Sequence, residues 1–136
     1  MDKQELIART RDFSLAIVRL WQMLPHRTDA TVLGKQLLRC ATSVGANYRA
    51  TVHARSKADF WAKLKICEEE ADESEYWLEL MEAAGIVPAQ QLAPLRREAH
   101  ELSCIMSAAA RTIRDSLDKS SIPHELRSLK FQNRNS

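Results

Sequence analysis

SKADFWAKLKICEEEADESEYWLELMEAAG, residues Ser56–Gly85, is the most regular stretch of this chain. Apolar and small residues recur in it at alternating spacings of three and four, the period of one helix face. Ser56 with Asp59 is typical of a helix start, and Gly85 with Pro88 beyond it is typical of a helix end. We therefore predict one long helix here. Its buried face comprises Phe60, Leu64, Cys67, Ala71, Ser74, Leu78 and Met81.

The same period predicts three more helices. Apolar residues recur over Glu5–Leu24 and again over Asp29–Val52, where Asp29 is a candidate N-cap. Another helix is expected to start between residues 89 and 94 and to reach Leu117. Each apolar stripe covers one helix face, so each helix needs neighbours to bury it.

The composition agrees with long helices. The 136 residues are 45% hydrophobic and include only three Gly and four Pro, too few for the many turns of a β-sandwich or barrel. Short loops between successive helices favour antiparallel neighbours. We predict an all-α protein, an antiparallel up-down four-helix bundle over residues 1–119, with a short, polar and basic C-terminal tail over residues 120–136.

Small and polar residues occupy the middle of the second predicted helix. A glycine there costs roughly 1 kcal/mol relative to alanine, so we expect Gly45, with Ala46, to mark a close crossing with another helix. Arg39, Ser43 and Asn47 are spaced by four, so they form a polar strip beside the apolar stripe. We expect this strip to be partly buried.

A tight hairpin between the second and third helices would place Cys40 about level with Cys67, and Arg39 opposite the acidic run EEEADESE. An unpaired, half-buried guanidinium is costly. We therefore predict that Arg39 pairs with Glu70 or Glu73, and these two carboxylates complete the polar strip.

The three cysteines include no CxxC pair, and each lies on or beside an apolar stripe. Buried free cysteines usually act as small hydrophobic residues, so we expect Cys40, Cys67 and Cys104 to be reduced core residues rather than a zinc or redox site. The four histidines are scattered, and His100 has no partner at the spacing of a di-metal carboxylate site. No phosphate-loop, dinucleotide or nucleophile motif is present. The sequence predicts no enzyme activity, metal, cofactor or small-molecule substrate.

The first residues, MDKQELIARTRD, carry charges of both signs and lack the apolar core of a signal peptide. Uncharged apolar runs are far shorter than the ~20 residues that a membrane span needs. We expect a cytoplasmic protein without membrane contact.

Charge is strongly segregated along the chain, although the formal net charge is only +2. Residues 30–65 hold seven basic residues and one acidic residue, whereas residues 66–85 hold eight acidic residues and no basic ones. Complementary patches on one protomer suit head-to-tail contacts, which close into rings when the rotation permits. The alternative is that these charges pair within the bundle or face water.

Basic residues gather around the turn between the second and third helices. Arg49, Arg55, Lys57 and Lys63 are candidate RNA- or DNA-binding residues, because lysine and arginine provide most phosphate contacts. Further bases lie in the predicted tail at Arg127, Lys130 and Arg134. Against this reading, the isoelectric point near 8.5 is low for a dedicated nucleic-acid-binding domain. The acidic half would also repel phosphate unless an interface hid it.

Trp61 and Trp77 lie beside the seam of the third helix, next to Phe60 and Leu78. Aromatic residues in such positions either complete the outer core or anchor a subunit interface. Because the adjacent seam positions are already filled, both tryptophans are candidate interface residues.

Four motifs carry a resemblance to a known family: RDF at Arg11–Phe13, QLLRCATSVGANYRA at Gln36–Ala50, RSKADFWAKL at Arg55–Leu64 and EEEADESEYWLEL at Glu68–Leu80. They resemble a four-helix-bundle family of small bacterial proteins. The family includes proteins encoded by intervening sequences in 23S ribosomal RNA genes and accessory proteins of diversity-generating retroelements. The residues that match its pattern in order and spacing are Gln36, Arg39, Ala41, Ser43, Asn47, Ser56, Phe60 and Glu73.

The resemblance implies a closed bundle assembled into a homopentameric ring, with nucleic-acid binding among the retroelement members and no catalytic residues. Where many members read Asn, apolar, Ala, Glu, Gly, this chain reads Asn47, Tyr48, Arg49, Ala50 and Thr51. The lost acid and glycine weaken the transfer of any ligand contact at that end of the helix. Two functions therefore stay open: a ring-forming module that binds RNA or DNA, and an oligomeric protein-interaction scaffold with no nucleic-acid role.

Overall fold

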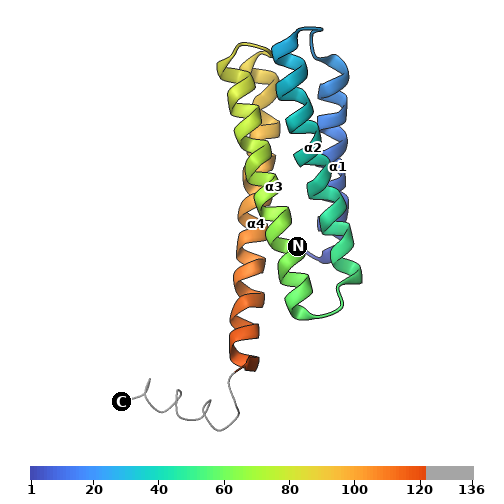
Figure 1. The fold of residues 1–136 in the computed structure, drawn as a ribbon, viewed down its shortest axis with the longest axis vertical. Coiled ribbons are helices and arrows are strands. Elements are labelled where there is room, and N and C mark those ends of the chain that lie inside the picture. The colour runs from blue at the N-terminus through green and yellow to red at the C-terminus, as the bar shows by residue number, and fades with distance from the viewer. Residues whose placement is uncertain (122–136) are drawn as a thin grey trace, which may run out of the picture.

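Four helices run alternately up and down in the computed structural model, which describes residues 1–121 (Figure 1). They are α1 (Lys3–Met23), α2 (Thr28–Ala50), α3 (Lys57–Ala83) and α4 (Ala89–Ser121), with a short 3-10 turn, η1, at Thr51–His53. Successive helices pack extensively, whereas α1 and α4 contact each other less. The predicted all-α, up-down four-helix bundle is thereby confirmed. Residues 122–136, which include the tail bases Arg127, Lys130 and Arg134, lie outside the described residues.

α3 begins and ends where the sequence predicts. Ser56 is its N-cap, and the Ser56 hydroxyl accepts a hydrogen bond from the Asp59 amide at 3.1 Å. The Asp59 carboxylate accepts from the Arg55 amide at 3.0 Å, so only half of the expected capping box forms. Gly85 follows the C-cap Ala84 with a φ of 70°, the left-handed conformation that ends many helices.

The start of α2 differs from the prediction, because Arg27 rather than Asp29 is the N-cap. Asp29 lies in the first turn, where its carboxylate accepts from the Arg27 guanidinium at 3.0 Å and from the Ala30 amide at 2.9 Å. A negative charge there still favours the helix, because it opposes the positive end of the dipole. At the start of α1, Asp2 and Glu5 form a full capping box that sequence reasoning missed.

The seam predicted for α3 lies at the centre of the core. Its fully buried members are Leu64, Cys67, Ala71, Ser74, Leu78 and Met81. Cys40 and Cys67 are buried as predicted, but the prediction for Cys104 is wrong, because Cys104 is exposed. Leu102 and Met106 take the buried positions of α4 on either side of it.

The hairpin of α2 and α3 turns later than predicted. Cys40 Sγ lies 3.2 Å from Ser74 Oγ, and Cys67 Sγ lies 3.8 Å from the Val44 carbonyl oxygen, so the two cysteines are not level. Relative to the predicted pairing of Cys40 with Cys67, these contacts are displaced by seven residues on α3 and by four residues on α2, which is one to two helical turns.

Gly45 marks the close crossing of two helices that the sequence predicts, and the partner is α1. A Cβ atom on Gly45 would lie 2.7 Å from Ser14 Oγ and 3.3 Å from the Thr10 carbonyl oxygen. The Ser14 hydroxyl donates to the Ala41 carbonyl at 2.7 Å, which ties α1 to α2 at this level. Ala46 is exposed and takes no part in the crossing, contrary to the prediction.

We predict that Gly45→Ala lowers the free energy of unfolding by about 1–3 kcal/mol, because overpacking outweighs the roughly 1 kcal/mol gain in helix propensity. Urea denaturation followed by circular dichroism measures this loss. The double variant Ser14→Ala/Gly45→Ala should recover part of it, since the oxygen nearest the new methyl group is removed. A Gly45→Ala protein more stable than the wild type would contradict the close crossing.

Candidate nucleic-acid interface

Three of the four candidate phosphate-binding residues lie at one end of the bundle. Arg49 is in the last turn of α2, Arg55 is in the following loop, and Lys57 is the first residue of α3. All three are exposed. Figure 1 shows this turn at the same end of the molecule as the N-terminus, and α4 extends past it. We call this region the basic end.

Lys63 stands apart from the other three. It is half-buried, and its ammonium donates to the Asp59 carboxylate at 2.6 Å, one helical turn back along α3. The hydrogen bond from Lys63 and that from the Arg55 amide hold the pKa of the Asp59 carboxyl below its usual value. Because Asp59 already neutralises Lys63, this lysine contributes less to the positive charge of the basic end.

The structure adds Lys3 to the basic end. The sequence alone did not identify this residue. Its ammonium donates to the Thr51 carbonyl at 3.5 Å and lies 5.0 Å from the centre of the Phe60 ring. On the α4 side, Lys57 donates to the Ser116 hydroxyl at 2.8 Å. The antiparallel order of α1 and α2 was the signal that could have placed Lys3 beside the turn.

Most acidic side chains of α3 that have a basic partner find it on a neighbouring helix. Arg39 of α2 donates to Glu73 at 2.6 Å and to Glu70 at 3.4 Å, so the predicted ion pair is present with both carboxylates. From α4, Arg96 pairs with Glu79 at 3.4 Å and with Glu82, and His100 contacts Glu75 at 3.2 Å. Within residues 1–121, no such ion pair forms at Arg49 or Arg55.

The polar strip of α2 is only partly connected. The Asn47 amide donates to the Ser43 carbonyl at 2.9 Å and to the Ser43 hydroxyl at 2.8 Å. Ser43 and Asn47 are half-buried, but the Arg39 side chain is 53% exposed, so that end of the strip faces water more than we expected. The strip therefore consists of a local pair and a separate interhelical ion pair.

Trp61 and Trp77 both pack on the core and are both half-buried. The Trp77 indole also donates to the Glu73 carboxylate at 3.2 Å, and its ring meets Tyr76 edge to face with centroids 5.0 Å apart. Tyr76 is 54% exposed and extends this aromatic surface toward solvent. Part of each tryptophan side chain therefore packs on the outer core, which is the alternative reading, and part of it is exposed.

The four helices, the filled core and the charged surfaces are those of a small all-α bundle protein. In the part of the chain that the structure describes, no three His, Cys, Asp or Glu side chains are placed to hold a metal ion, and no helix is apolar and long enough to cross a membrane. The 23S rRNA-intervening sequence protein family matches residues 2–108. The chain therefore belongs to the 23S rRNA-intervening sequence protein family.

A solved structure supports the same assignment. It is the crystal structure of a protein of unknown function from the S23 ribosomal protein family of Bacteroides thetaiotaomicron, 32% identical to this chain, with a TM-score of 0.75. The match covers 82% of this chain and 99% of that one. The search of curated proteins gives no match.

Glu70 and Glu73 share Arg39 but differ in their surroundings. Burial raises the pKa of the Glu70 carboxyl, Arg39 opposes this rise, and the neighbouring charges of Glu73 and Glu69 add to it. A carboxyl whose pKa is raised by folding stabilises the folded state only when protonated. That stabilisation is complete below the unfolded pKa and is lost as the pH rises through the folded pKa. Ionised Glu70 therefore costs stability at neutral pH.

We expect Glu70→Gln to raise the free energy of unfolding at pH 7, with the gain disappearing as the pH falls below about 4. Glu73→Gln is the matched control and should lose up to about 1 kcal/mol, because Glu73 accepts from both Arg39 and Trp77. Thermal unfolding at pH 7 and pH 3.5 measures both effects. Equal losses for the two variants at pH 7 would show that Glu70 is stabilised by its ion pair instead.

Proposed function

We propose that this protein is a non-enzymatic, homopentameric ring that binds RNA or DNA through the basic end. The observation that carries the proposal is the contrast between the two halves of the hairpin. Basic partners from α2 and α4 reach Glu70, Glu73, Glu75, Glu79 and Glu82 of α3. Arg49 and Arg55 are exposed and take part in no ion pair within the described residues, so their charge is available to an anionic partner.

The chemistry of the basic end suits phosphate. Arginine presents a planar fork of donors that matches phosphate oxygens, and lysine adds a compact charge. Arg49, Arg55, Lys57 and Lys3 come from α1, α2, the loop and α3, so they form a surface rather than a line along one helix. Such a surface binds the nucleic-acid backbone without reading its sequence.

Assembly into a ring would strengthen this binding, because each subunit repeats the basic end. The pentamer is the expectation that comes with the family resemblance, and the opposite charges of α3 and the basic end favour head-to-tail contact. The exposed acids Glu69 and Asp72 on α3 are candidates for such a contact. Multiple weak phosphate sites on one assembly bind a long strand far more tightly than one site does.

A protein-interaction scaffold is the second candidate. The observation that favours it is the aromatic surface of Trp77 and Tyr76 beside acidic residues on α3, because aromatic side chains are enriched in protein interfaces. The acidic residues make this surface unsuitable for phosphate groups, and it would bind a basic protein partner.

Fluorescence anisotropy of labelled RNA and DNA tests the main proposal at two salt concentrations. The variant Arg49→Gln/Arg55→Gln should bind at least about tenfold more weakly and show a salt slope smaller by about one to two. Arg19→Gln/Lys35→Gln removes the same charge from exposed positions elsewhere and should change binding little. Equal losses in the two variants, or no binding at low salt, would exclude the basic end and leave the scaffold.

Native mass spectrometry should find a species of five times the 15.5 kDa chain mass. Trp61→Ala should reduce that species while circular dichroism shows a folded bundle, because interface aromatics carry a large share of association energy. A folded monomer for the wild type at micromolar concentration would contradict the ring, whatever the result of the nucleic-acid titration.

A further inference from the structure

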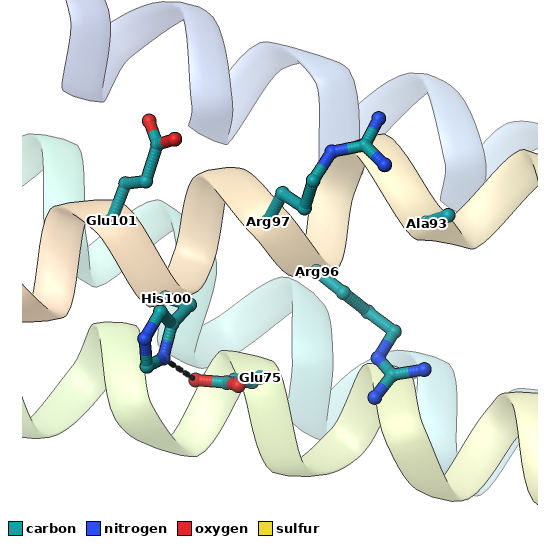
Figure 2. Close-up of a pocket in the computed structure, with 6 residues that line it drawn as sticks. All are labelled: Glu75, Ala93, Arg96, Arg97, His100 and Glu101. Carbon is teal, nitrogen blue, oxygen red and sulfur yellow. Dashed lines mark hydrogen bonds and ion pairs between the residues drawn. The ribbon is translucent and has the colours of Figure 1, made fainter.

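Three polar side chains from two helices contact one another in sequence on the outer surface of α3 and α4: Glu75, His100 and Cys104. Cys104 Sγ lies 3.6 Å from His100 Nε2, and His100 Nδ1 lies 3.2 Å from a Glu75 carboxylate oxygen. Figure 2 shows the second contact, with His100 of α4 directed toward Glu75 of α3. From the sequence, His100 has no partner at the spacing of a di-metal site, and Cys104 is predicted to be a core residue. The spacing of four between them was the signal that could have joined them.

The order of the three groups determines where the protons lie. A carboxylate can only accept a hydrogen bond when ionised, so Glu75 orients the ring with hydrogen on Nδ1. Nε2 then has a free electron pair, and that pair faces the Cys104 thiol. This is the arrangement in which a base activates a nucleophile and a third group orients the base.

The surroundings of Cys104 are open, and two exposed arginines lie on its face of α4. Cys104 and Ala108, one turn later, are exposed, and the small alanine leaves one side of the thiol uncovered. Arg97 and Arg111 lie seven residues before and after Cys104, so both share its face of the helix, and both are exposed. Neither takes part in an ion pair within residues 1–121, whereas the nearby Glu101 is paired with Arg9.

A shallow groove is lined by two of the three groups, Glu75 and His100, but not by Cys104. It is lined by Glu75, Ala93, Arg96, Arg97, His100 and Glu101 and has a volume of about 400 Å³ (Figure 2). Arg96 is occupied by Glu79 and Glu82, which leaves Arg97 as the cation of the groove that is free to meet an anion. The groove therefore offers room and a free cation beside His100, which contacts the thiol.

We propose that Cys104 is a nucleophilic thiol that forms mixed disulfides with small disulfides bearing carboxylates. His100 Nε2 takes the thiol proton, and the thiolate attacks one sulfur of the small disulfide. A new S–S bond forms, the original S–S bond breaks, and the leaving thiolate takes the proton from His100. Glu75 is the positioning residue for His100, while Arg97 and Arg111 attract the carboxylates of the incoming molecule.

The other two cysteines provide an internal comparison. Burial raises the pKa of the Cys40 thiol, and burial raises the pKa of the Cys67 thiol to about 12. Both side chains are fully buried in the core. Thiolate is the reacting form, so these two thiols should react only when the bundle opens.

Metal binding is the competing use of the same pair. A separation of 3.6 Å also suits two ligands of one zinc ion, and Glu75 would orient His100 equally well for a metal. A zinc site normally needs three or four protein ligands, and among the described residues no third ligand joins the pair. The nucleophile needs only the groups already in place, so the structure favours it.

The test measures thiol exchange on the native protein with two probes, the dianionic 5,5′-dithiobis(2-nitrobenzoate) and the uncharged 4,4′-dithiodipyridine. One thiol per chain should react in a fast phase that is lost in Cys104→Ser. His100→Asn should slow that phase at least about tenfold with either probe. Arg97→Gln/Arg111→Gln should slow only the dianionic probe, by about threefold.

Glu75→Ala should slow the fast phase with both probes, and Glu75→Gln should restore part of the rate, because its amide oxygen still accepts from Nδ1. Circular dichroism checks that each variant is folded. A fast phase that survives Cys104→Ser, or that is unchanged in His100→Asn, overturns the proposal. Binding of one micromolar-affinity Zn²⁺ per chain that needs both His100 and Cys104 would also overturn it, in favour of a metal site.

Discussion

The close approach of α2 and α3 over small side chains is the constraint on which the rest of the molecule depends. Cys67, Ala71 and Ser74 are fully buried at the middle of α3, and Cys40 Sγ meets Ser74 Oγ at 3.2 Å. Small side chains leave space between two helices. Because protein interiors are close-packed, the neighbouring helix moves in to fill that space, and the two backbones approach. The same approach brings Arg39 within reach of both Glu70 and Glu73, so the interhelical ion pairs follow from the packing and do not cause it.

This packing also explains why positive charge remains at one end. The acidic run of α3 starts at Glu68, about 16 Å of helix rise beyond Lys57, where α2 and α4 lie alongside and supply basic partners. The turn that carries Arg49 and Arg55 lies past the ends of these contacts, and within residues 1–121 neither side chain takes part in an ion pair. The charge segregation read along the sequence therefore becomes a flank of α3 where interhelical ion pairs form and an end where Arg49 and Arg55 form none within residues 1–121.

The helix pattern could be predicted because each signal was local. The seam of α3, its Ser56 cap and Gly85 depend on residues within a few turns, and Gly45 in mid-helix had a single physical explanation. The errors arose where the answer depended on the chain between elements or on helix rotation. The register of Cys40 against Cys67 depended on how the chain turns between α2 and α3, and Cys104 lies outside the core although Leu102 and Met106 on either side of it are buried. Lys63 was grouped with the basic end because of its position in the sequence, but the structure pairs its ammonium with the Asp59 carboxylate.

A closed core confines function to the surface. In residues 1–121 every buried side-chain nitrogen and oxygen has a hydrogen-bond partner, so the interior offers no unsatisfied group to a ligand. Two of the surfaces that remain are the basic end and the Cys104 face of α4. Cys104 lies twelve residues before Ser116, the partner of Lys57, which is about 18 Å of helix rise. That separation exceeds the screening length of about 8 Å at physiological salt, so an anionic group attached to Cys104 would change the electrostatic potential at the basic end little through its charge alone. Any coupling between the two surfaces within one chain has to act through the packing of α4.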